Sequence, residues 1–99
     1  MALTSKQRQY LKGLAHLLTP VVRVGQGGVT EGVTTETKRS LLAHELIKVR
    51  IDATGDEKKS LAEQLASAVE ADIAGVIGKM AILYRRSEDD PKIKLPSAK

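Results

Sequence analysis

Cysteine, phenylalanine and tryptophan are absent from this chain of 99 residues, and tyrosine occurs only twice. Without cysteine the chain can form no disulfide, no thiolate nucleophile and no cysteine-ligated metal site. With so few aromatic rings, recognition of unpaired bases by aromatic stacking is disfavoured. The longest unbroken apolar run, 80–84, is far too short to span a membrane, and the first residues contain no apolar signal segment. We therefore expect a cytoplasmic protein with no membrane partner.

Patterns typical of catalytic or metal-binding sites are also missing. The two histidines, His16 and His44, have no serine–acid partner set and no metal-ligand spacing. The acidic run Glu88–Asp90 stands before a proline in a polar segment, where a solvated stretch is the simpler interpretation. The sequence predicts no enzyme, no metal, no cofactor and no small-molecule substrate.

Positive charge is unevenly distributed along the chain, whose net charge is +4. Residues 1–50 contain eight lysines and arginines against three acids, whereas residues 51–99 contain eight against nine. A basic half beside a nearly neutral one indicates a surface directed at a polyanion, although ordinary solubility charge would give a similar composition.

The first half of the chain predicts two helices around a short strand. A capping-box pattern at Thr4 opens the first helix, and Pro20 ends it near Leu18. The β-branched run Val21–Val24 predicts a strand, and Thr30 is the expected N-cap of the second helix. The expected apolar stripe of the first helix consists of Tyr10, Leu11, Leu14, Leu17 and Leu18.

The second half predicts a strand, a helix and a hairpin. Residues 45–52 alternate between apolar and polar side chains, which indicates a strand, and Asp56 is the expected cap of the third helix. Strands are expected at 73–77 and 80–85. Two residues separate them, and a glycine in first place fits a type II′ hairpin with Lys79 at its tip.

Together these elements predict an α/β fold in the order α-β-α-β-α-β-β, with two layers and a four-stranded mixed sheet. We expect one domain at 1–86, a loose polar tail at 87–99 and a monomer. The alternation around Ile47 and Val49 predicts one covered and one solvated sheet face. Arg23, Lys48 and Arg50 would lie on the solvated face.

The loop Gly25–Gly28 (GQGG) joins a strand to a helix start, an arrangement that phosphate sites use. It is not a Walker motif, because Val29 and Thr30 stand where Lys and Ser/Thr are required, and the dinucleotide fingerprint also fails at Thr30. What remains is a GxxG pattern, which clamps nucleic-acid backbone in KH domains, although there it joins two helices. The same glycines would serve a tight turn with positive φ. Both interpretations stay open.

Nucleic-acid binding is favoured because several features coincide on elements that can be neighbours. The scarcity of aromatics favours contacts to the phosphates and sugars of structured RNA, with strongly salt-dependent affinity. An alternative is a protein-interaction module that docks an acidic protein partner; a small-nucleotide binder is disfavoured by the missing Walker lysine. Besides the loop, the candidate contacts are Lys12, Arg23, Lys48, Arg50 and Lys79.

Three segments, LTSKQRQYLKGLAHLLTPVVRVGQGGVTEGV, HELIKVRI and VIGKMAILYRR, stand in the order found in a known family. They resemble the CRM domain (chloroplast RNA splicing and ribosome maturation), whose stand-alone bacterial members are the YhbY-type proteins, and the similarity extends over about residues 3–95. The resemblance implies a fold like that of the C-terminal domain of translation initiation factor three. It also implies RNA binding, and association with rRNA in precursors of the large (50S) ribosomal subunit during assembly.

The resemblance further implies which positions contact RNA. Inside the loop Gln26 and Gly27 carry no positive charge, so attraction must come from backbone N–H groups and from neighbouring basic side chains. The positions that match are Gly25, Gln26, Gly27, Gly28, Lys12, His16, Lys48, Lys79 and Arg85.

Overall fold

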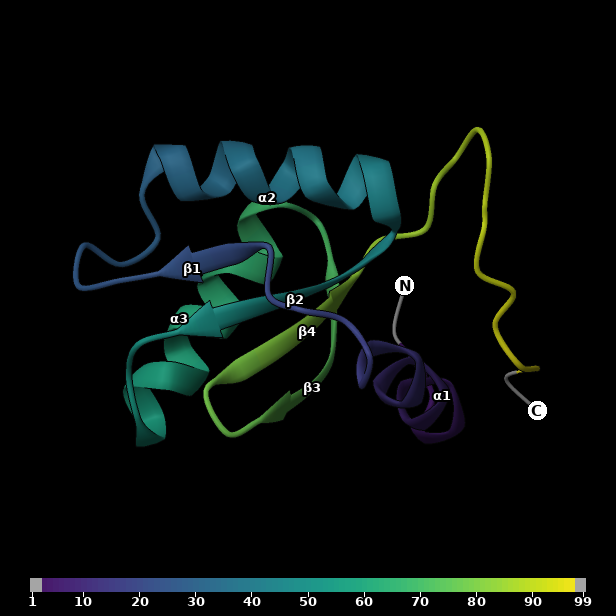
Figure 1. Cartoon of the computed structure of the whole chain (residues 1–99), viewed down its shortest axis with the longest axis horizontal. Coiled ribbons are helices and arrows are strands. Elements are labelled where there is room, and N and C mark those ends of the chain that lie inside the picture. The colour runs from purple at the N-terminus through teal and green to yellow at the C-terminus, as the bar shows by residue number, and fades with distance from the viewer. Residues whose placement is uncertain (1–2, 98–99) are drawn as a thin grey trace.

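The computed structural model describes residues 3–97, which form a single mixed sheet with helices on both faces (Figure 1). The strand order is β1-β2-β4-β3, with β1 parallel to β2 and the other neighbours antiparallel. The predicted α/β fold, its element order and its four-stranded mixed sheet are confirmed. The elements are α1 (Ser5–Ala15), β1 (Val22–Val24), α2 (Glu31–His44), β2 (Leu46–Ile51), α3 (Gly55–Ala68), β3 (Asp72–Ile77) and β4 (Met80–Tyr84).

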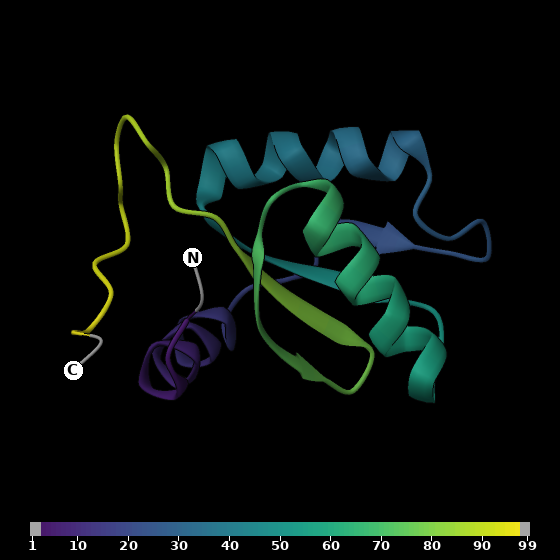
Figure 2. The same ribbon diagram turned by 180° about the vertical axis from the view of Figure 1, so that it is seen from behind.

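One face of the sheet is covered by α2 and α3, and α3 crosses in front of the strands when the molecule is seen from behind (Figure 2). The alternating residues Ile47, Val49 and Ile51 of β2 point into this core, as their spacing predicts. Leu41 of α2 and Leu65 of α3 meet them there. Burial of these side chains is the main force that holds both helices to the sheet.

The opposite face is divided between α1 and solvent. Leu11 and Ala15 of α1 are fully buried in a second core that includes Ile82 and Tyr84 of β4. The helix covers only the end of the sheet at which β2 begins, so the prediction of a solvated face holds for the rest of it. We call this uncovered part the open face; Arg23 and Arg50, paired across β1 and β2, lie on it.

The predicted apolar stripe of α1 is largely wrong. The helix ends at Ala15, earlier than expected, and Leu17 beyond it is 89% exposed. Leu14 and Leu18 are 40% and 39% exposed, because the narrow contact with the sheet needs only the row that holds Leu11 and Ala15. An apolar surface is thereby left uncovered beside the open face.

Two of the three helices begin at the N-cap residue that the sequence predicts. The capping box of α1 is present: Gln7 N donates to Thr4 Oγ1 at 3.1 Å, and Thr4 N donates to Gln7 Oε1 at 3.0 Å. Thr30 caps α2 as predicted. For α3 the sequence predicts Asp56 as the cap, but the N-cap is Thr54 and Asp56 lies in the first turn. Gly55, with φ of 58°, allows the chain to enter the helix earlier than expected.

The segment after residue 86 was expected to be a loose tail, but its described part, 87–97, is attached to the domain. The Glu45 carboxylate, only 1% exposed, accepts hydrogen bonds from the backbone N–H groups of Ser87 (2.8 Å), Lys92 (2.5 Å) and Ile93 (2.9 Å). Burial raises the pKa of Glu45, but these N–H groups and the charge of Lys92 outweigh it, so the pKa lies below its ordinary value. Ile93 and Leu95 also pack against the second core. These contacts join distant parts of the chain, so no local pattern could reveal them.

Within the described part of the chain, none of the helices combines the length and the apolar character needed to cross a membrane.

Candidate nucleic-acid interface

The Gly25–Gly28 loop and the β3–β4 hairpin lie at the same end of the sheet. Because β1 and β2 are parallel they end together, and the antiparallel strand β4 begins beside them. Asp52 N donates to Val24 O at 2.9 Å, and Ile51 N donates to Lys79 O at 2.7 Å. The sheet topology therefore brings the loop and the predicted hairpin-tip lysine close together.

The loop is a tight turn that projects from the sheet at the left of Figure 1. Gly28 N donates to Gly25 O at 3.0 Å, and Gly28 has φ of 74°, so this position does require glycine. The fold itself does not require glycine at Gly25, because φ is not positive there and a Cβ would meet nothing within 4 Å. Gln26 and Gly27 are exposed. The structure thus supports the turn interpretation at Gly28 and leaves open space around Gly25 for the approach of a ligand.

The hairpin tip has the predicted geometry. Ile77 pairs with Met80, so Gly78 and Lys79 alone form the connection. Gly78 has φ of 58° and Lys79 has no positive φ, which is the type II′ pattern. Lys79 is exposed, and Lys58 of α3 donates from Nζ to Gly78 O at 2.5 Å. Lys58 adds a cation to this end of the sheet. The sequence does not indicate this contact, because Lys58 follows the acidic residues at the start of α3.

Asp52 joins two of the predicted arginines. Its carboxylate accepts from Arg23 Nε at 2.5 Å and from Arg50 Nε at 3.0 Å, while the side chains of the two arginines are 70% and 43% exposed. Two hydrogen bonds hold the pKa of Asp52 below its ordinary value. The one from Arg23 contributes most and the one from Arg50 comes next. The terminal nitrogens of both guanidinium groups stay available to another anion, in fixed positions.

Lys12, His16 and Lys48 line one hollow of about 100 Å³ whose apolar wall includes Met80 and Ile82. Lys12 reaches the sheet because β3 has a glycine, Gly75, beneath it: a Cβ at that position would lie 2.6 Å from Lys12 Cδ. A helix, a strand and the hairpin thus bring together three residues that the sequence singled out separately.

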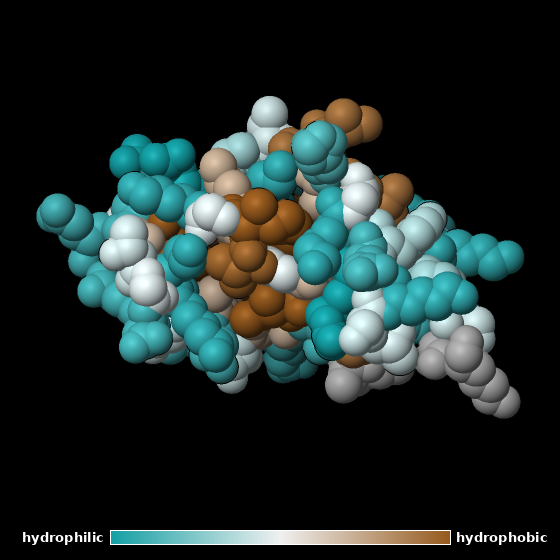
Figure 3. All heavy atoms as spheres, turned by 90° about the horizontal axis from the view of Figure 1, so that it is seen from below, coloured by the Kyte–Doolittle hydropathy of each residue, from teal (hydrophilic) through white to brown (hydrophobic). Residues whose placement is uncertain are grey.

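Seen from below, onto the β3 side, the molecule shows an apolar patch framed by polar side chains (Figure 3).

Arg85 is not brought together with the other candidates. Ile82 and Tyr84 of β4 face the α1 side, so Arg85, which follows Tyr84, points to the other face. There it lines a hollow with Leu41 and Leu42 of α2. It also lies at the end of β4 opposite to the hairpin.

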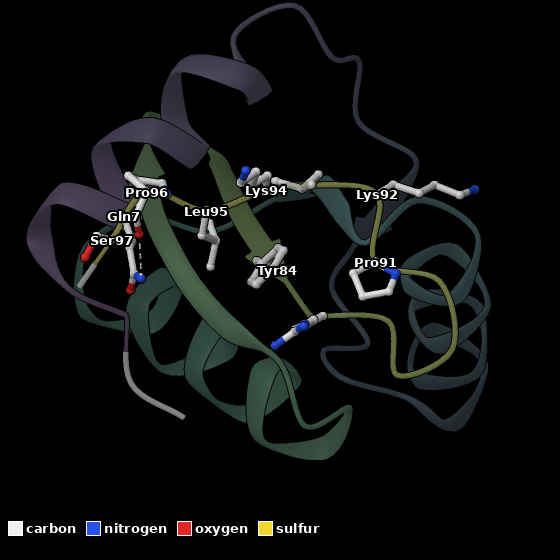
Figure 4. A pocket seen from close by; sticks show the side chains of 10 residues that line it. Gln7, Tyr84, Pro91, Lys92, Lys94, Leu95, Pro96 and Ser97 are labelled. Carbon is white, nitrogen blue, oxygen red and sulfur yellow. Dashed lines mark hydrogen bonds between the residues drawn. The ribbon is translucent and has the colours of Figure 1, made fainter. Parts of the chain in front are cut away.

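A larger hollow, about 550 Å³, lies beneath the attached tail (Figure 4). Gln7 lies on one side of it, where Gln7 Nε2 donates to Pro96 O at 3.1 Å, and Tyr84 lies below. The Tyr84 hydroxyl is buried and has no hydrogen-bond partner among residues 3–97. Burial, and then the charge of Glu45, raise the pKa of Tyr84. This hollow is at the end of β4 away from the hairpin, so it is separate from the open face.

Among residues 3–97, no three histidine, aspartate or glutamate side chains come together in a way that could hold a metal ion.

Comparison with known proteins gives consistent similarities. The model of the CRS1 / YhbY (CRM) domain matches residues 3–85. The chain is 45% identical over 95 residues to a protein of Haemophilus influenzae named RNA-binding protein, covering 95% of each chain. It is 42% identical over 88 residues to a probable RNA-binding protein of Pseudomonas aeruginosa, covering 88% of this chain and 85% of the other. The solution structure of a hypothetical Staphylococcus aureus protein, SAV1595, described as a candidate RNA-binding protein, matches with a TM-score of 0.85 and 40% identity over 95% of this chain and 99% of that one.

Proposed function

This chain belongs to the CRS1 / YhbY (CRM) domain family, and from that premise we propose that it binds structured RNA through the open face and the Gly25–Gly28 loop. The supporting observation is the convergence of the loop, the hairpin tip and the basic side chains of α1, β1 and β2 on one region of the surface. The proposed phosphate contacts are Lys12, His16, Arg23, Lys48, Arg50 and Lys79, with Gly25 and Gly28 allowing the RNA backbone to approach.

The proposed contacts are to phosphates and sugars, which position a protein on RNA without selecting a sequence. Arg23 and Arg50 would present their terminal nitrogens as paired donors, which match the geometry of a phosphate. Lys12 and Lys48 would act as point charges beside them. Arg85, on the other face, contributes nothing to this surface despite its match to the family pattern.

The Gly25–Gly28 loop is tested by Gly25→Asp. The new side chain has room and no backbone strain, so the fold should persist, whereas the added negative charge should weaken RNA binding at least about tenfold. Binding to a structured rRNA fragment is measured by filter retention, with the fold checked by circular dichroism. Gln64→Glu on the exposed side of α3 makes the same change in net charge and should leave affinity nearly unaltered. Unchanged affinity in Gly25→Asp would show that the loop assignment is wrong.

We further propose that the RNA is rRNA within precursors of the large (50S) ribosomal subunit, that the protein acts as a cytoplasmic monomer without catalysis, and that residues 1–86 form the binding domain. Sucrose-gradient sedimentation of a lysate tests this. Co-migration with 50S precursors that ribonuclease abolishes is the expected result. Association with a free acidic protein that survives ribonuclease would instead favour a protein-interaction module.

A further inference from the structure

An apolar groove of about 340 Å³ lies beside the open face, between the end of α1, the end of α2 and the first residues of β2. Leu14, Leu18 and Val21 form its exposed wall, each about 40% exposed. The segment that leads from α1 to β1 passes in front of the sheet here (Figure 1). We propose that this groove receives one unpaired nucleobase of the bound RNA, an inference that rests on the proposed function.

The composition of the groove suits a base. Flat aliphatic walls can contact the two faces of a base ring, so the scarcity of aromatic residues is no obstacle. Its polar lining groups are few: the Thr19 hydroxyl, the His44 imidazole and the Lys48 ammonium. None of these three side chains forms a hydrogen bond or ion pair within the described residues, so they can serve the polar edge of a base. An apolar site with a small number of convergent polar groups is the usual form of a small-ligand pocket, and its volume falls in the usual range of about 300–1,000 Å³.

The position of the groove connects it to the phosphate contacts. Lys48 lines both the groove and the hollow that contains Lys12 and His16. A nucleotide with its base in the groove would therefore place its phosphate beside three basic side chains. Apolar side chains of a protein would fill the groove equally well, but they would make no use of these cations. Continuity with the proposed RNA surface thus favours a base.

Two RNAs distinguish base capture from general RNA binding. One is a fully paired RNA duplex of two strands, and the other is the same duplex with a single bulged 2-aminopurine nucleotide. We expect the wild type to bind the bulged RNA about tenfold more tightly, and the fluorescence of the 2-aminopurine to change on binding. Equal affinity for the two RNAs would overturn the inference while leaving the proposed function intact. Failure to bind either RNA would count against both.

The double variant Leu14→Ser, Leu18→Ser tests the groove itself. It should bind the fully paired duplex as the wild type does and lose the preference for the bulge. Leu17→Ser is the matched control, because Leu17 is 89% exposed and does not line the groove. Urea unfolding of each variant verifies the fold. A preference that persists in the double variant would overturn the inference, as would RNA-independent self-association that requires Leu14 and Leu18, since a second copy would then occupy the groove.

Discussion

Asp52 reduces the positive charge at the centre of the proposed RNA surface. Its carboxylate lies between the guanidinium groups of Arg23 and Arg50, so this group of three side chains carries one net positive charge instead of two. Both arginines remain exposed to solvent, so the ion pairs contribute little to folding stability. Their effect is to hold two otherwise flexible side chains in position, at the cost of placing an anion where phosphates would bind.

The substitution Asp52→Asn should therefore raise RNA affinity by about threefold to tenfold at low salt, because a repulsive charge is removed. Titration with a structured RNA at two salt concentrations measures the change, which should shrink at high salt. Glu63→Gln on the exposed side of α3 makes the same change in net charge away from the surface and serves as control. Weaker binding of Asp52→Asn would mean that arginine positioning matters more than charge.

Glu45 is the second acid whose role is visible only in the structure. Its pKa is lowered in the folded protein, so its contribution to stability is present above about pH 4.3, the ordinary value of glutamate, and is lost as pH falls through the lower folded pKa. Glu45→Gln should lower the free energy of unfolding at pH 7 by about 1–3 kcal/mol. In this variant the free energy of unfolding should also fall less steeply as the pH drops below about 4.3. Urea unfolding at pH 7 and pH 3.5 measures both effects, and equal pH dependence in wild type and variant would contradict this role.

At the scale of elements, α1 shows how far a periodic pattern can be trusted. Its capping box was predicted correctly because the signal is local, whereas the buried side was not, because five apolar residues can form a stripe without all facing the core. Which row is buried depends on where the sheet lies, and that is a tertiary property. The alternation in β2 was more informative, since a strand has only two sides.

Gly13 offers a test of what α1 needs. A packing role would explain a glycine inside a helix, but a Cβ at this position would meet nothing within 4 Å. Gly13→Ala should therefore stabilise the protein by about 0.5–1 kcal/mol, through helix propensity and a less flexible unfolded chain. The change in stability is measured from the midpoint of urea unfolding. Should the variant be more stable but bind RNA less tightly, the absence of a side chain at Gly13 serves the ligand.

At the scale of the whole molecule, the sequence predicted the elements and most of the candidate surface, but not the contacts that organise it. Alternation along β2 predicts the face of Lys48 and Arg50, and the turn rule predicts Lys79 at the hairpin tip. Arg23 joins them because it pairs with Arg50 across β1 and β2. Arg85 matches the family pattern but lies on the other face, beside α2. Gly75, which makes room for Lys12, and Asp52, which holds two arginines, act across strands and helices, so no sequence spacing indicates them.

The salt dependence of RNA binding reports on the whole surface. The logarithm of the binding constant should fall with the logarithm of salt concentration, with a slope of about −0.7 to −0.9 for each phosphate neutralised. Lys48→Gln should reduce the magnitude of this slope by about 1, whereas Arg85→Gln, on the other face, should leave it unchanged. If Arg85→Gln changes the slope and Lys48→Gln does not, the RNA lies on the opposite face.

The placement of α1 has a consequence for how the domain folds. This helix rests mainly on β3 and β4, which follow it only much later in the sequence, and Gln7 Nε2 donates to Pro96 O. Such contacts form only after a long loop of chain has closed, so α1 should become stably packed late in folding. Removal of residues 93–97 should therefore make α1 more accessible to proteases, although the two segments lie far apart in the sequence.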